Sequence, residues 1–345
     1  MRTRLHLMEL PHRIMIGQDV LRLLGKFMEM PRSARIVVAS GLNVQQRVRE
    51  VVAASLDGRV SWVDVKFSDM KNVRSVMRAS RGAKCIVGLG GGKSVDVGKL
   101  AASKLNLPFF SVPTSASHDG IASPFASIRG TEKHYSIKAK PPLGILADVD
   151  VISAAPPRLF SAGCGDLVAK LTAVRDWQLG HEANGEYYGE YAANLAMMSG
   201  RLIIDNSRRM GRGDTSAVRD LVEALISTGV AAGIAGSSRP CSGSEHLFSH
   251  ALDVISPGNG LHGEKCGIGT ILVANLQGLD WRAIRGALKN VKAPTSAAEI
   301  GVSDDQVVEA LVGASEIRPD RYTILSKVGL TTRTARALAA ETGVI

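Results

Sequence analysis

The feature that most restricts the fold of this chain is a regular alternation over its first 150 or so residues. Short β-branched runs alternate there with longer stretches whose apolar residues recur at helical spacing. This alternation is typical of βαβ units that build a mainly parallel sheet. The expected strands cover 35–40, 60–65, 85–89, 109–112 and 144–147, and the expected helices between them cover 44–54, 70–80 and 94–105. The polar segment 127–140 suits a hairpin or loop at the sheet edge.

The character of the sequence changes at Pro156 and Pro157. Beyond this pair, strand-like runs nearly vanish, and Ala, Leu, Gly and Met recur every three or four residues to the end of the chain. We therefore expect an α/β domain over 1–155 and an all-helical domain over 156–345. The expected helices of the second domain cover 158–180, 187–210, 215–235, 244–254, 262–277, 281–288, 303–312 and 331–341.

Composition excludes several classes of protein. No apolar run approaches the roughly 18 residues of a membrane helix, and no signal peptide is readable, so we expect a soluble, cytoplasmic protein without stable membrane insertion. The net charge is +10, but aromatic residues make up only 4% and long basic runs are missing, which disfavours nucleic acid and leaves a small anionic substrate. The four cysteines form no CxxC pair, so neither a disulfide framework nor a thiolate zinc knuckle is indicated. Helix faces rich in Ala and Gly favour a homo-oligomer.

A glycine-rich loop follows the expected strand 85–89. Gly88 and Gly90 to Gly92 precede Lys93, Ser94 and an amphipathic helix. Glycines allow close approach of a phosphate, and a helix N-terminus offers free amides, so this loop is a candidate anion cradle. Its spacing matches neither the P-loop nor GxGxxG, and a simple turn capped by Ser94 is the alternative. A second loop, 113–120, follows the next strand and either serves the same nucleotide or is a Ser/Thr-capped turn.

Three of the eight histidines lie close together in the second half of the chain. His246 and His250 are four residues apart, hence on one helix face, and His262 enters from a glycine-rich loop. This grouping predicts a metal site, although HExxH is excluded because no glutamate follows either helical histidine. The carboxylate ligand must come from elsewhere. Asp166 is the best candidate because it is an acid in an apolar segment of small residues; a helix-capping role is the alternative.

Five motifs together resemble one family: GGGKSVDVGK at 90–99, PTSASHDG at 113–120, GCGD at 163–166, SGSEHLFSHALD at 242–253 and HGE at 262–264. They resemble the archaeal-type sn-glycerol-1-phosphate dehydrogenases, in the superfamily of glycerol dehydrogenase, iron-containing alcohol dehydrogenases and dehydroquinate synthase. The resemblance runs in order over nearly the whole chain. It implies a Rossmann-like, dinucleotide-binding N-terminal domain and a helical metal- and substrate-binding domain. The active site would lie in the cleft between them, with one zinc ion per subunit.

The resemblance also implies roles for individual residues. Asp166, His246 and His262 match the zinc ligands, while Asp119 and His250 match catalytic, substrate-contacting positions; Asp166 also matches a substrate contact. This reading moves His250 from metal ligand to proton relay. The positions implied for NAD(H) or NADP(H) are Gly91, Gly92, Lys93, Ser94, Val95, Asp96, Thr114, Ser115, Ala116, Ser117 and Ser123.

The activity implied by the resemblance is the reversible reduction of dihydroxyacetone phosphate to sn-glycerol 1-phosphate, the first step of archaeal ether phospholipid backbone synthesis. The alternatives are a glycerol dehydrogenase acting on an unphosphorylated polyol and a non-catalytic relative that binds zinc or nucleotide. No acid follows the strand 35–40, so nothing there repels a 2′-phosphate, and we expect both NADH and NADPH to be used. Candidate phosphate partners are Lys138, Lys140, Arg208 and Arg209.

Overall fold

The computed structural model describes residues 6–130 and 134–345. They divide into two compact units. The first unit comprises the chain up to Pro156 together with Val218–Gly236, and the second comprises Pro157–Ala217 and Ser237–Ile345. The expected boundary between 155 and 156 lies one residue before this division, and most of one later helix is grouped with the first unit.

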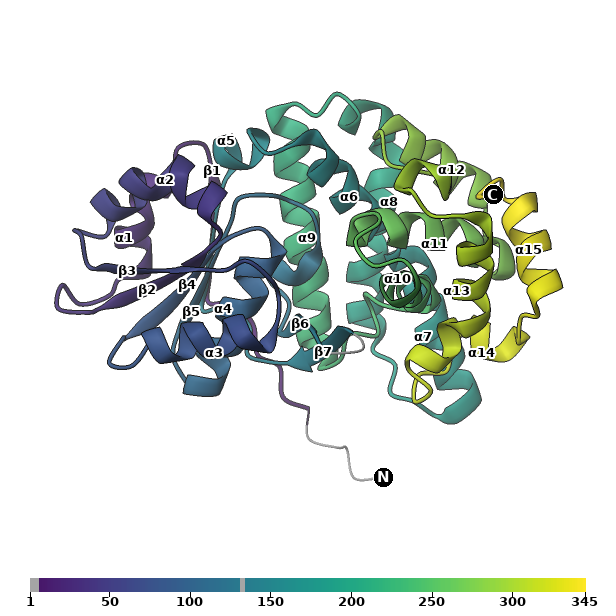
Figure 1. Ribbon diagram of the computed structural model, residues 1–345, viewed down its shortest axis with the longest axis horizontal. Coiled ribbons are helices and arrows are strands. Elements are labelled where there is room, and N and C mark those ends of the chain that lie inside the picture. Colours follow the sequence, from purple (N-terminus) through teal and green to yellow (C-terminus); the bar gives the residue numbers. More distant parts are fainter. Residues whose placement is uncertain (1–5, 131–133) are drawn as a thin grey trace. The chain divides into compact units, whose positions relative to one another are not determined.

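A six-stranded parallel sheet is the centre of the first unit (Figure 1). Its order is β1-β8-β5-β4-β2-β3, and every neighbouring pair is parallel. The strands are β1 (Arg13–Gly17), β2 (Ile36–Ser40), β3 (Val60–Asp64), β4 (Cys85–Gly90), β5 (Phe109–Pro113) and β8 (Gly144–Asp148). The expected parallel α/β class is confirmed. Strand β1 was not expected, because its five residues pair with β8, which is distant in the sequence.

Helices cover both faces of this sheet. A cluster of buried residues on one face joins β2, β4 and β5 to α1 (Leu24–Met28) and α2 (Leu42–Ser55). A second cluster on the other face joins the sheet to α3 (Met70–Ala79) and α4 (Gly92–Leu105). Because both faces are covered, the central strands are apolar throughout rather than alternating. The 3-10 turn η1 (Leu21–Leu23) precedes α1, and α5 (Val149–Ser153) follows β8.

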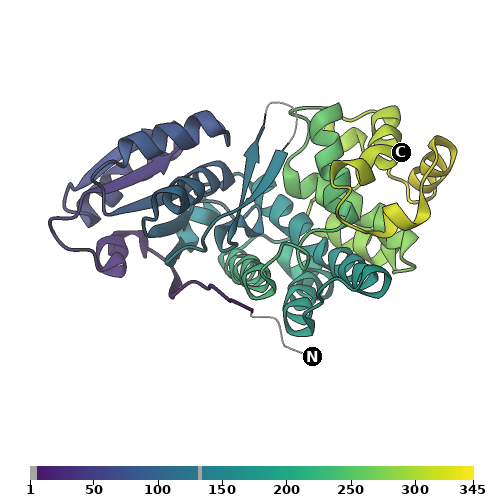
Figure 2. The ribbon, with the colours of Figure 1, turned by 90° about the horizontal axis from the view of Figure 1, so that it is seen from below.

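The segment expected as a hairpin or loop forms a separate antiparallel pair, β6 (Phe125–Arg129) and β7 (His134–Lys138), seen in Figure 2. It is a two-stranded sheet of its own rather than an edge of the main sheet. Residues 131–133, within the expected segment 127–140, lie outside the described residues. Strand β6 packs against α4, the helix that follows the glycine loop. The β6–β7 pair therefore lies beside that helix.

Helix α9 (Thr215–Ala235) was expected in the helical domain, but from Val218 onward it is grouped with the first unit. Two of its glycines explain this grouping. A Cβ atom on Gly229 would lie 2.6 Å from the backbone nitrogen of Ser123, and one on Gly233 would lie 3.0 Å from the carbonyl oxygen of Glu9. The helix therefore contacts the backbone of the first unit through positions that leave no room for a side chain.

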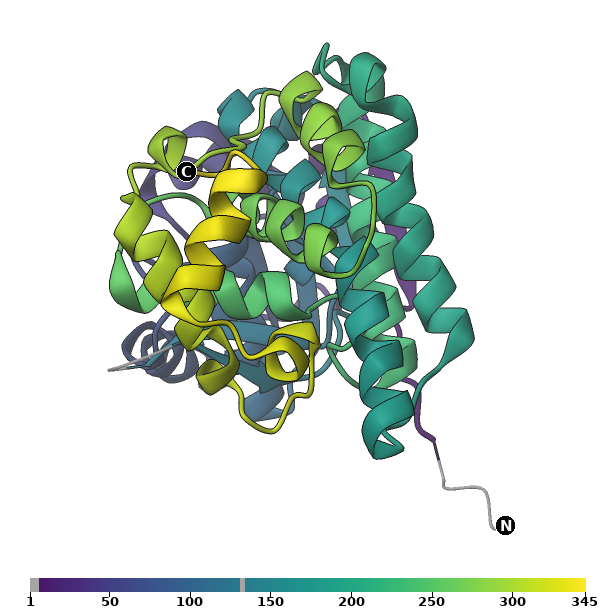
Figure 3. The ribbon, with the colours of Figure 1, turned by 90° about the vertical axis from the view of Figure 1, so that its right-hand side faces the viewer.

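The second unit, all of which is described, contains helices and no strand. Figure 3 shows two of its C-terminal helices, α13 and α15, side by side. Its helices are α6 (Pro157–Val168), α7 (Lys170–Asn184), α8 (Glu190–Met210), α10 (Ser244–Ile255), α11 (His262–Leu276), α12 (Trp281–Asn290), α13 (Asp304–Ile317), α14 (Ile324–Val328) and α15 (Thr332–Glu341). Among residues 6–130 and 134–345, no helix combines the length and apolarity that a membrane span requires.

One expected helix, 158–180, is divided in the structure. Helix α6 ends at Val168 and α7 begins at Lys170. At the break, the amides of Thr172 and Ala173 both donate to the carbonyl oxygen of Ala169, at 3.2 and 3.0 Å. The Thr172 bond spans three residues instead of four, so the backbone tightens there into a 3-10 turn, which the spacing of apolar residues alone does not show.

Glycines also set the spacing at the centre of the second unit. A Cβ atom on Gly263 of α11 would lie 1.9 Å from the carbonyl oxygen of Ala162, and one on Gly165 of α6 would lie 2.2 Å from that of Gly263. A Cβ atom on Gly269 would lie 2.9 Å from the carbonyl oxygen of Glu245 on α10. Helix α11 therefore approaches both α6 and α10 closely, which brings polar side chains of three helices to one place.

Candidate functional site

The glycine loop, residues 88–93, connects β4 to α4 in the first unit. Gly90 has a φ of +144°, a conformation that residues with a side chain rarely adopt. Gly91 is the N-cap, and its carbonyl oxygen accepts from the amides of Ser94 and Val95 at 3.0 and 3.2 Å. The amides that precede Ser94 have no helical partner by geometry, so they and the positive end of the helix dipole favour an anion here.

The second loop, residues 113–120, contacts the glycine loop directly. The Thr114 amide donates to the carbonyl oxygen of Gly90 at 3.1 Å, and the Ser115 hydroxyl lies 3.1 Å from the position of a Cβ atom on Gly91. A Cβ atom on Gly92 would lie only 2.0 Å from Nε2 of His118. The two loops predicted to serve one nucleotide are therefore neighbours at the carboxyl ends of adjacent strands.

A buried ion pair joins α4 to the second loop. Lys99 is fully buried, and its Nζ donates to Oδ1 of Asp96 at 3.2 Å and to the carbonyl oxygens of Gly120 and Phe125 at 2.6 and 2.7 Å. Burial lowers the pKa of Lys99, although Asp96 and Asp119 oppose that shift. The other oxygen of Asp96 accepts from the amide of Ser127 at 3.2 Å. Asp96, predicted as a cofactor contact, thus also fixes the loop geometry.

The remaining predicted cofactor and substrate residues of the first unit differ in exposure. Lys93 is exposed. The half-buried residues are Gly91, Gly92, Thr114, Ser117 and Asp119, and the buried ones are Val95, Ser115, Ala116 and Ser123. The hydroxyl of Ser123 accepts from the Phe125 amide at 3.1 Å. Asp119 begins the 3-10 turn η2 (Asp119–Ile121), and its carbonyl oxygen accepts from two following amides.

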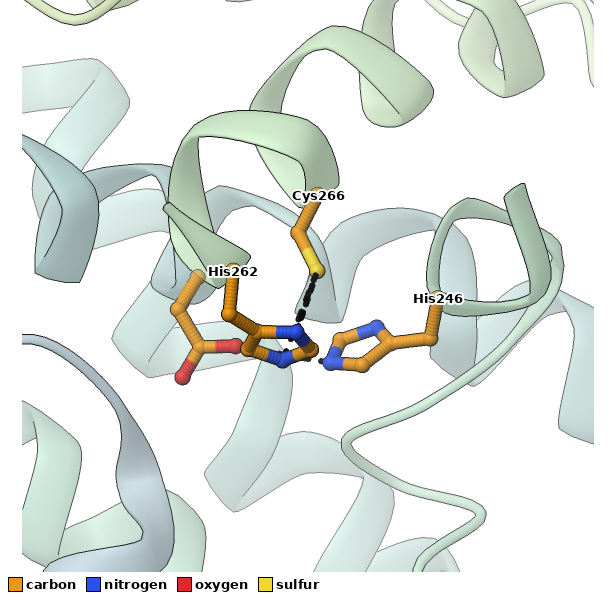
Figure 4. A group of neighbouring side chains, drawn as sticks. His246, His262 and Cys266 are labelled. Atoms are coloured by element: carbon orange, nitrogen blue, oxygen red, sulfur yellow. Dashed lines mark hydrogen bonds and ion pairs between the residues drawn. The ribbon is translucent and has the colours of Figure 1, made fainter. Parts of the chain in front are cut away.

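The second unit brings Asp166, His246 and His262 together with Cys266. Asp166 lies on α6, His246 on α10, and the other two on α11. One potential ligand atom from each lies within 4.8 Å of the others, and Oδ1 of Asp166 is 3.4 Å from Nε2 of His246. Figure 4 shows the two imidazole rings and the thiol directed toward one another. We call these four residues the metal cluster, since carboxylate, imidazole and thiolate are the donors that zinc prefers.

Glu245 fixes the orientation of the His246 ring. Its Oε1 lies 2.8 Å from Nδ1 of His246 and accepts from the Gly243 amide at 2.6 Å, while Oε2 accepts from the hydroxyl of Thr172 at 2.8 Å. With Nδ1 held by a carboxylate, Nε2 is the nitrogen that faces Asp166. A carboxylate behind a histidine ligand is the usual support of protein metal sites.

The electrostatics of the metal cluster favour a cation. Burial opposes ionisation of Asp166, but Lys170 at 2.9 Å and His246 outweigh it and hold the pKa of Asp166 well below its ordinary value. Burial likewise opposes protonation of His246, but Cys266, Asp166 and Glu245 raise its pKa well above the ordinary value. Burial and the nearby His246 hold the pKa of His262 well below the ordinary value. The ionised Asp166 and the neutral His262 are suitable donors for a divalent ion, whereas His246 must release its proton before Nε2 binds one.

His250 lies beside the metal cluster rather than within it. Its ring centroid is 5.7 Å from that of His262, with the planes nearly parallel, and 6.5 Å from that of His246. Its Nδ1 is 3.7 Å from Oδ2 of Asp253, which also pairs with Lys265. Burial lowers the pKa of His250, so the neutral ring is the dominant form at pH 7.

The glutamate of the HGE motif fixes the start of α11. Arg158 donates from Nε and Nη2 to the two oxygens of Glu264 at 2.5 and 2.7 Å. The second oxygen also accepts from the Leu261 amide at 2.7 Å, which caps the helix whose first residue is His262. This bidentate pair therefore holds one metal-cluster histidine in place from behind.

The four residues predicted to bind the substrate phosphate lie outside the glycine loop and the metal cluster. Lys138 and Lys140 are exposed in the first unit, where Nζ of Lys140 donates to Asn106 at 2.7 Å. Arg208 and Arg209 lie in the last turn of α8 in the second unit. None of the four belongs to the glycine loop or to the metal cluster.

Two functional candidates were missed from the sequence. Cys266 lies four residues after His262, a spacing that places both on one helix face. The lack of CxxC pairs excludes a thiolate zinc knuckle, but it does not exclude a single thiolate ligand. Lys170 lies four residues after Asp166 and is fully buried against it, a pairing equally readable from the same spacing.

Comparison with known proteins agrees with this geometry. The family model described as iron-containing alcohol dehydrogenase matches residues 15–156. A protein of Nitrosopumilus maritimus is 49% identical over 351 residues, which cover 100% of this chain and 98% of the relative. One of Cenarchaeum symbiosum is 52% identical over 98% of this chain and 97% of its own length. Both are named glycerol-1-phosphate dehydrogenase, with NAD(P)+ in the name.

The chain belongs to the glycerol-1-phosphate dehydrogenase family. The family expected from the five motifs is therefore confirmed. Solved structures of lower sequence identity have the same fold. A probable glycerol dehydrogenase from Sinorhizobium meliloti matches with a TM-score of 0.83 at 21% identity, covering 99% of this chain and 100% of that one. The glycerol dehydrogenase of Schizosaccharomyces pombe matches with a TM-score of 0.82 at 18% identity, covering 99% and 91%.

Proposed function

We propose that this chain catalyses the reversible NAD(P)H-dependent reduction of dihydroxyacetone phosphate to sn-glycerol 1-phosphate, assisted by one zinc ion per subunit. The activity follows the name shared by relatives that match the chain along its whole length. The observation that carries the metal is the convergence of Asp166, His246 and His262 from three helices, with their ligand atoms within 4.8 Å of one another. The donor set of one carboxylate and two imidazoles fits a catalytic zinc site with three protein ligands.

The roles of the chain's own residues follow from their surroundings. A zinc ion bound at Asp166, His246 and His262 supplies Lewis-acid polarisation of the ketone. Bound NAD(P)H supplies the hydride, and the amides of the glycine loop hold its phosphates at the start of α4. Lys170 keeps Asp166 ionised, because an ammonium group 2.9 Å away stabilises the carboxylate in a buried place.

His250 is the proposed proton carrier. Its lowered pKa keeps the ring neutral at pH 7, so it accepts the alcohol proton in the oxidation direction and returns it in the reduction direction. Asp119, in the first unit, is the second proposed catalytic and substrate-contacting residue. We also propose that the site of the adenosine ribose accepts both NADH and NADPH, because β2 is followed by Gly41 and Leu42, which carry no charge to repel a 2′-phosphate.

The test is oxidation of NADH and NADPH by zinc-loaded protein with dihydroxyacetone phosphate and, in parallel, with unphosphorylated dihydroxyacetone. The proposal expects turnover that strongly favours the phosphorylated ketone with either cofactor, and chiral analysis that identifies sn-glycerol 1-phosphate as the product. A preference for the unphosphorylated ketone would assign the chain to glycerol dehydrogenase activity instead. Cofactor and zinc binding without turnover of either ketone would indicate a non-catalytic relative.

A further inference from the structure

Cys266 is directed into the metal cluster by the geometry of α11. It lies one helical turn after His262, and its Sγ is 3.6 Å from Nε2 and 3.9 Å from Nδ1 of that ring. The same sulfur lies within 4.8 Å of the ligand atoms of Asp166 and His246. Figure 4 shows the thiol approaching the rings from a helix turn above them. Four potential ligand atoms therefore surround one point.

Two of the six separations between the ligand atoms agree with a four-coordinate ion. Zinc bonds of about 2.0 Å to nitrogen and oxygen and about 2.3 Å to sulfur give a tetrahedron with edges of about 3.3 to 3.6 Å. The Asp166 to His246 separation is 3.4 Å and the Cys266 to His262 separation is 3.6 Å. These are two opposite edges of the tetrahedron, and both are close to the length that a four-coordinate ion requires.

The other cysteines have different surroundings. Cys85 is part of the apolar cluster on one face of the sheet, and burial raises the pKa of its thiol to about 12. Cys164 lies on α6, two residues before Asp166, where burial raises the pKa of its thiol. Of the four cysteines, Cys266 is the one whose sulfur belongs to the metal cluster. Cys164 therefore offers a matched control that is equally buried and close in sequence to a proposed ligand.

We infer that Cys266 is a fourth protein ligand of the metal in the resting protein, an inference that rests on the metal site of the proposed function. A thiolate is a soft ligand, so it favours zinc and cobalt over manganese and magnesium, which prefer oxygen. It also occupies the position that a catalytic site with three protein ligands keeps for substrate. A metal held by these four residues would have no open position in the absence of substrate.

The test uses cobalt(II) in place of zinc, because cobalt bound to sulfur shows an intense near-ultraviolet charge-transfer band that nitrogen and oxygen ligands do not produce. The full chain, Cys266→Ser and Cys164→Ser are each loaded with cobalt, and bound metal is counted. The expected result is the band in the full chain and in Cys164→Ser but not in Cys266→Ser. Competition with a chelator should show that Cys266→Ser binds cobalt about tenfold more weakly or worse. Loss of a group that only hydrogen-bonds a metal ligand already lowers metal affinity by about that factor. Manganese affinity should change less than threefold, on the order of measurement scatter.

The outcomes separate this inference from the proposed function. Cobalt bound to the unmodified chain without the sulfur band would overturn the role of Cys266 and leave a site of three ligands. Failure to bind cobalt at all would overturn both the inference and the proposed metal site. A sulfur band in a protein that does not reduce dihydroxyacetone phosphate would support the inference and contradict the proposed function. The spectrum of the unmodified chain decides the matter even if Cys266→Ser fails to fold.

Discussion

The glycine loop of the first unit and the metal cluster of the second are built by opposite means. The glycine loop works through backbone amides and through missing side chains, since a Cβ atom on Gly92 would meet His118 at 2.0 Å. The metal cluster works through side-chain atoms that three helices bring within 4.8 Å. Adding atoms should therefore damage the first site, whereas removing or reorienting atoms should damage the second.

Both sites nevertheless depend on a fully buried lysine paired with an aspartate. Lys99 joins Asp96 to two carbonyl oxygens of the neighbouring segment, so it fixes loop positions. Lys170 donates to Asp166 at 2.9 Å, so it sets the charge of a proposed ligand. In the glycine loop, where backbone amides would bind the ligand, the buried lysine fixes the position of the backbone. In the metal cluster, where side chains would bind the ligand, the buried lysine keeps a carboxylate ionised.

The largest effect is expected for His262→Ala, which removes one proposed ligand. Turnover should fall about 10³-fold, because Lewis-acid catalysis contributes several kcal/mol to the transition state. Bound zinc should be lost while the dissociation constant for NADH is unchanged, as measured by fluorescence titration. His181→Ala, an exposed histidine of α7, is the control and should behave as the unmodified chain. Full turnover with zinc still bound in His262→Ala would refute the ligand assignment.

The next effect concerns the pH dependence of stability near the metal cluster. Burial, and then the charge of Glu245, raise the pKa of Asp176 to about 6. The folded protein therefore holds this proton more tightly than the unfolded chain, so the stability contributed by protonated Asp176 is complete below about pH 4 and is lost as the pH rises to about 6. The loss is about 3 kcal/mol, at about 1.4 kcal/mol per pH unit between the two pKa values.

Urea unfolding of metal-free protein between pH 4 and pH 7 measures this effect. The free energy of unfolding of the unmodified chain minus that of Asp176→Asn should decrease across that range and then level off. Because both proteins carry all other titrating groups, the difference isolates Asp176. A difference that is independent of pH would show that Asp176 is ionised throughout.

A smaller effect is expected for Gly92→Ala in the glycine loop. The new methyl group displaces the His118 ring beside the amides proposed to hold the phosphates, so KM for NADH should rise about 100-fold, the scale of a misplacement of about 1 Å. Zinc content should stay the same. The matched control is Gly286→Ala, an exposed position of α12 where a Cβ atom meets nothing within 4 Å. Adding His118→Ala to Gly92→Ala should recover part of the affinity, and no recovery would locate the damage elsewhere.

The smallest effect is expected for Glu245→Gln, which keeps every proposed ligand but weakens the support of the His246 ring. Zinc affinity should fall about 10- to 100-fold. The same substitution removes the charge that helps raise the pKa of Asp176, so the decrease in stability between pH 4 and pH 6 should become smaller. If the zinc affinity of Glu245→Gln stayed within about threefold of that of the unmodified chain, about the error of such a measurement, Glu245 would have no role in metal binding.

Much of the fold was predictable because its signals are local. Strand and helix periodicity predicted five of the six sheet strands, whereas β1 is short and is defined by pairing with β8. The grouping of α9 depends on Gly229 contacting Ala122 and Ser123, and the break at Ala169 coincides with a three-residue backbone bond from the Thr172 amide. Such contacts between distant or single atoms leave no periodic pattern.

The candidate site divides in the same way. The three histidines were visible by their spacing, and Asp166 by the cost of burying an acid among small residues. Cys266 lies four residues after His262, and Lys170 lies four residues after Asp166. This helical spacing would have been enough to predict that both side chains lie beside a proposed ligand. The support of His246 by Glu245 required knowing that Thr172 and Gly243 lie beside the same carboxylate. The cytoplasmic location and self-association rest on composition and stay predictions.

The most direct test of the division of labour between the two sites is one zinc-loaded sample measured before and after a strong chelator. NADH binding and reduction of dihydroxyacetone phosphate are followed on the same protein, and zinc is then restored. We predict that the chelator abolishes turnover and leaves the dissociation constant for NADH unchanged, and that zinc restores turnover. Full turnover in protein shown to be free of metal would contradict the account.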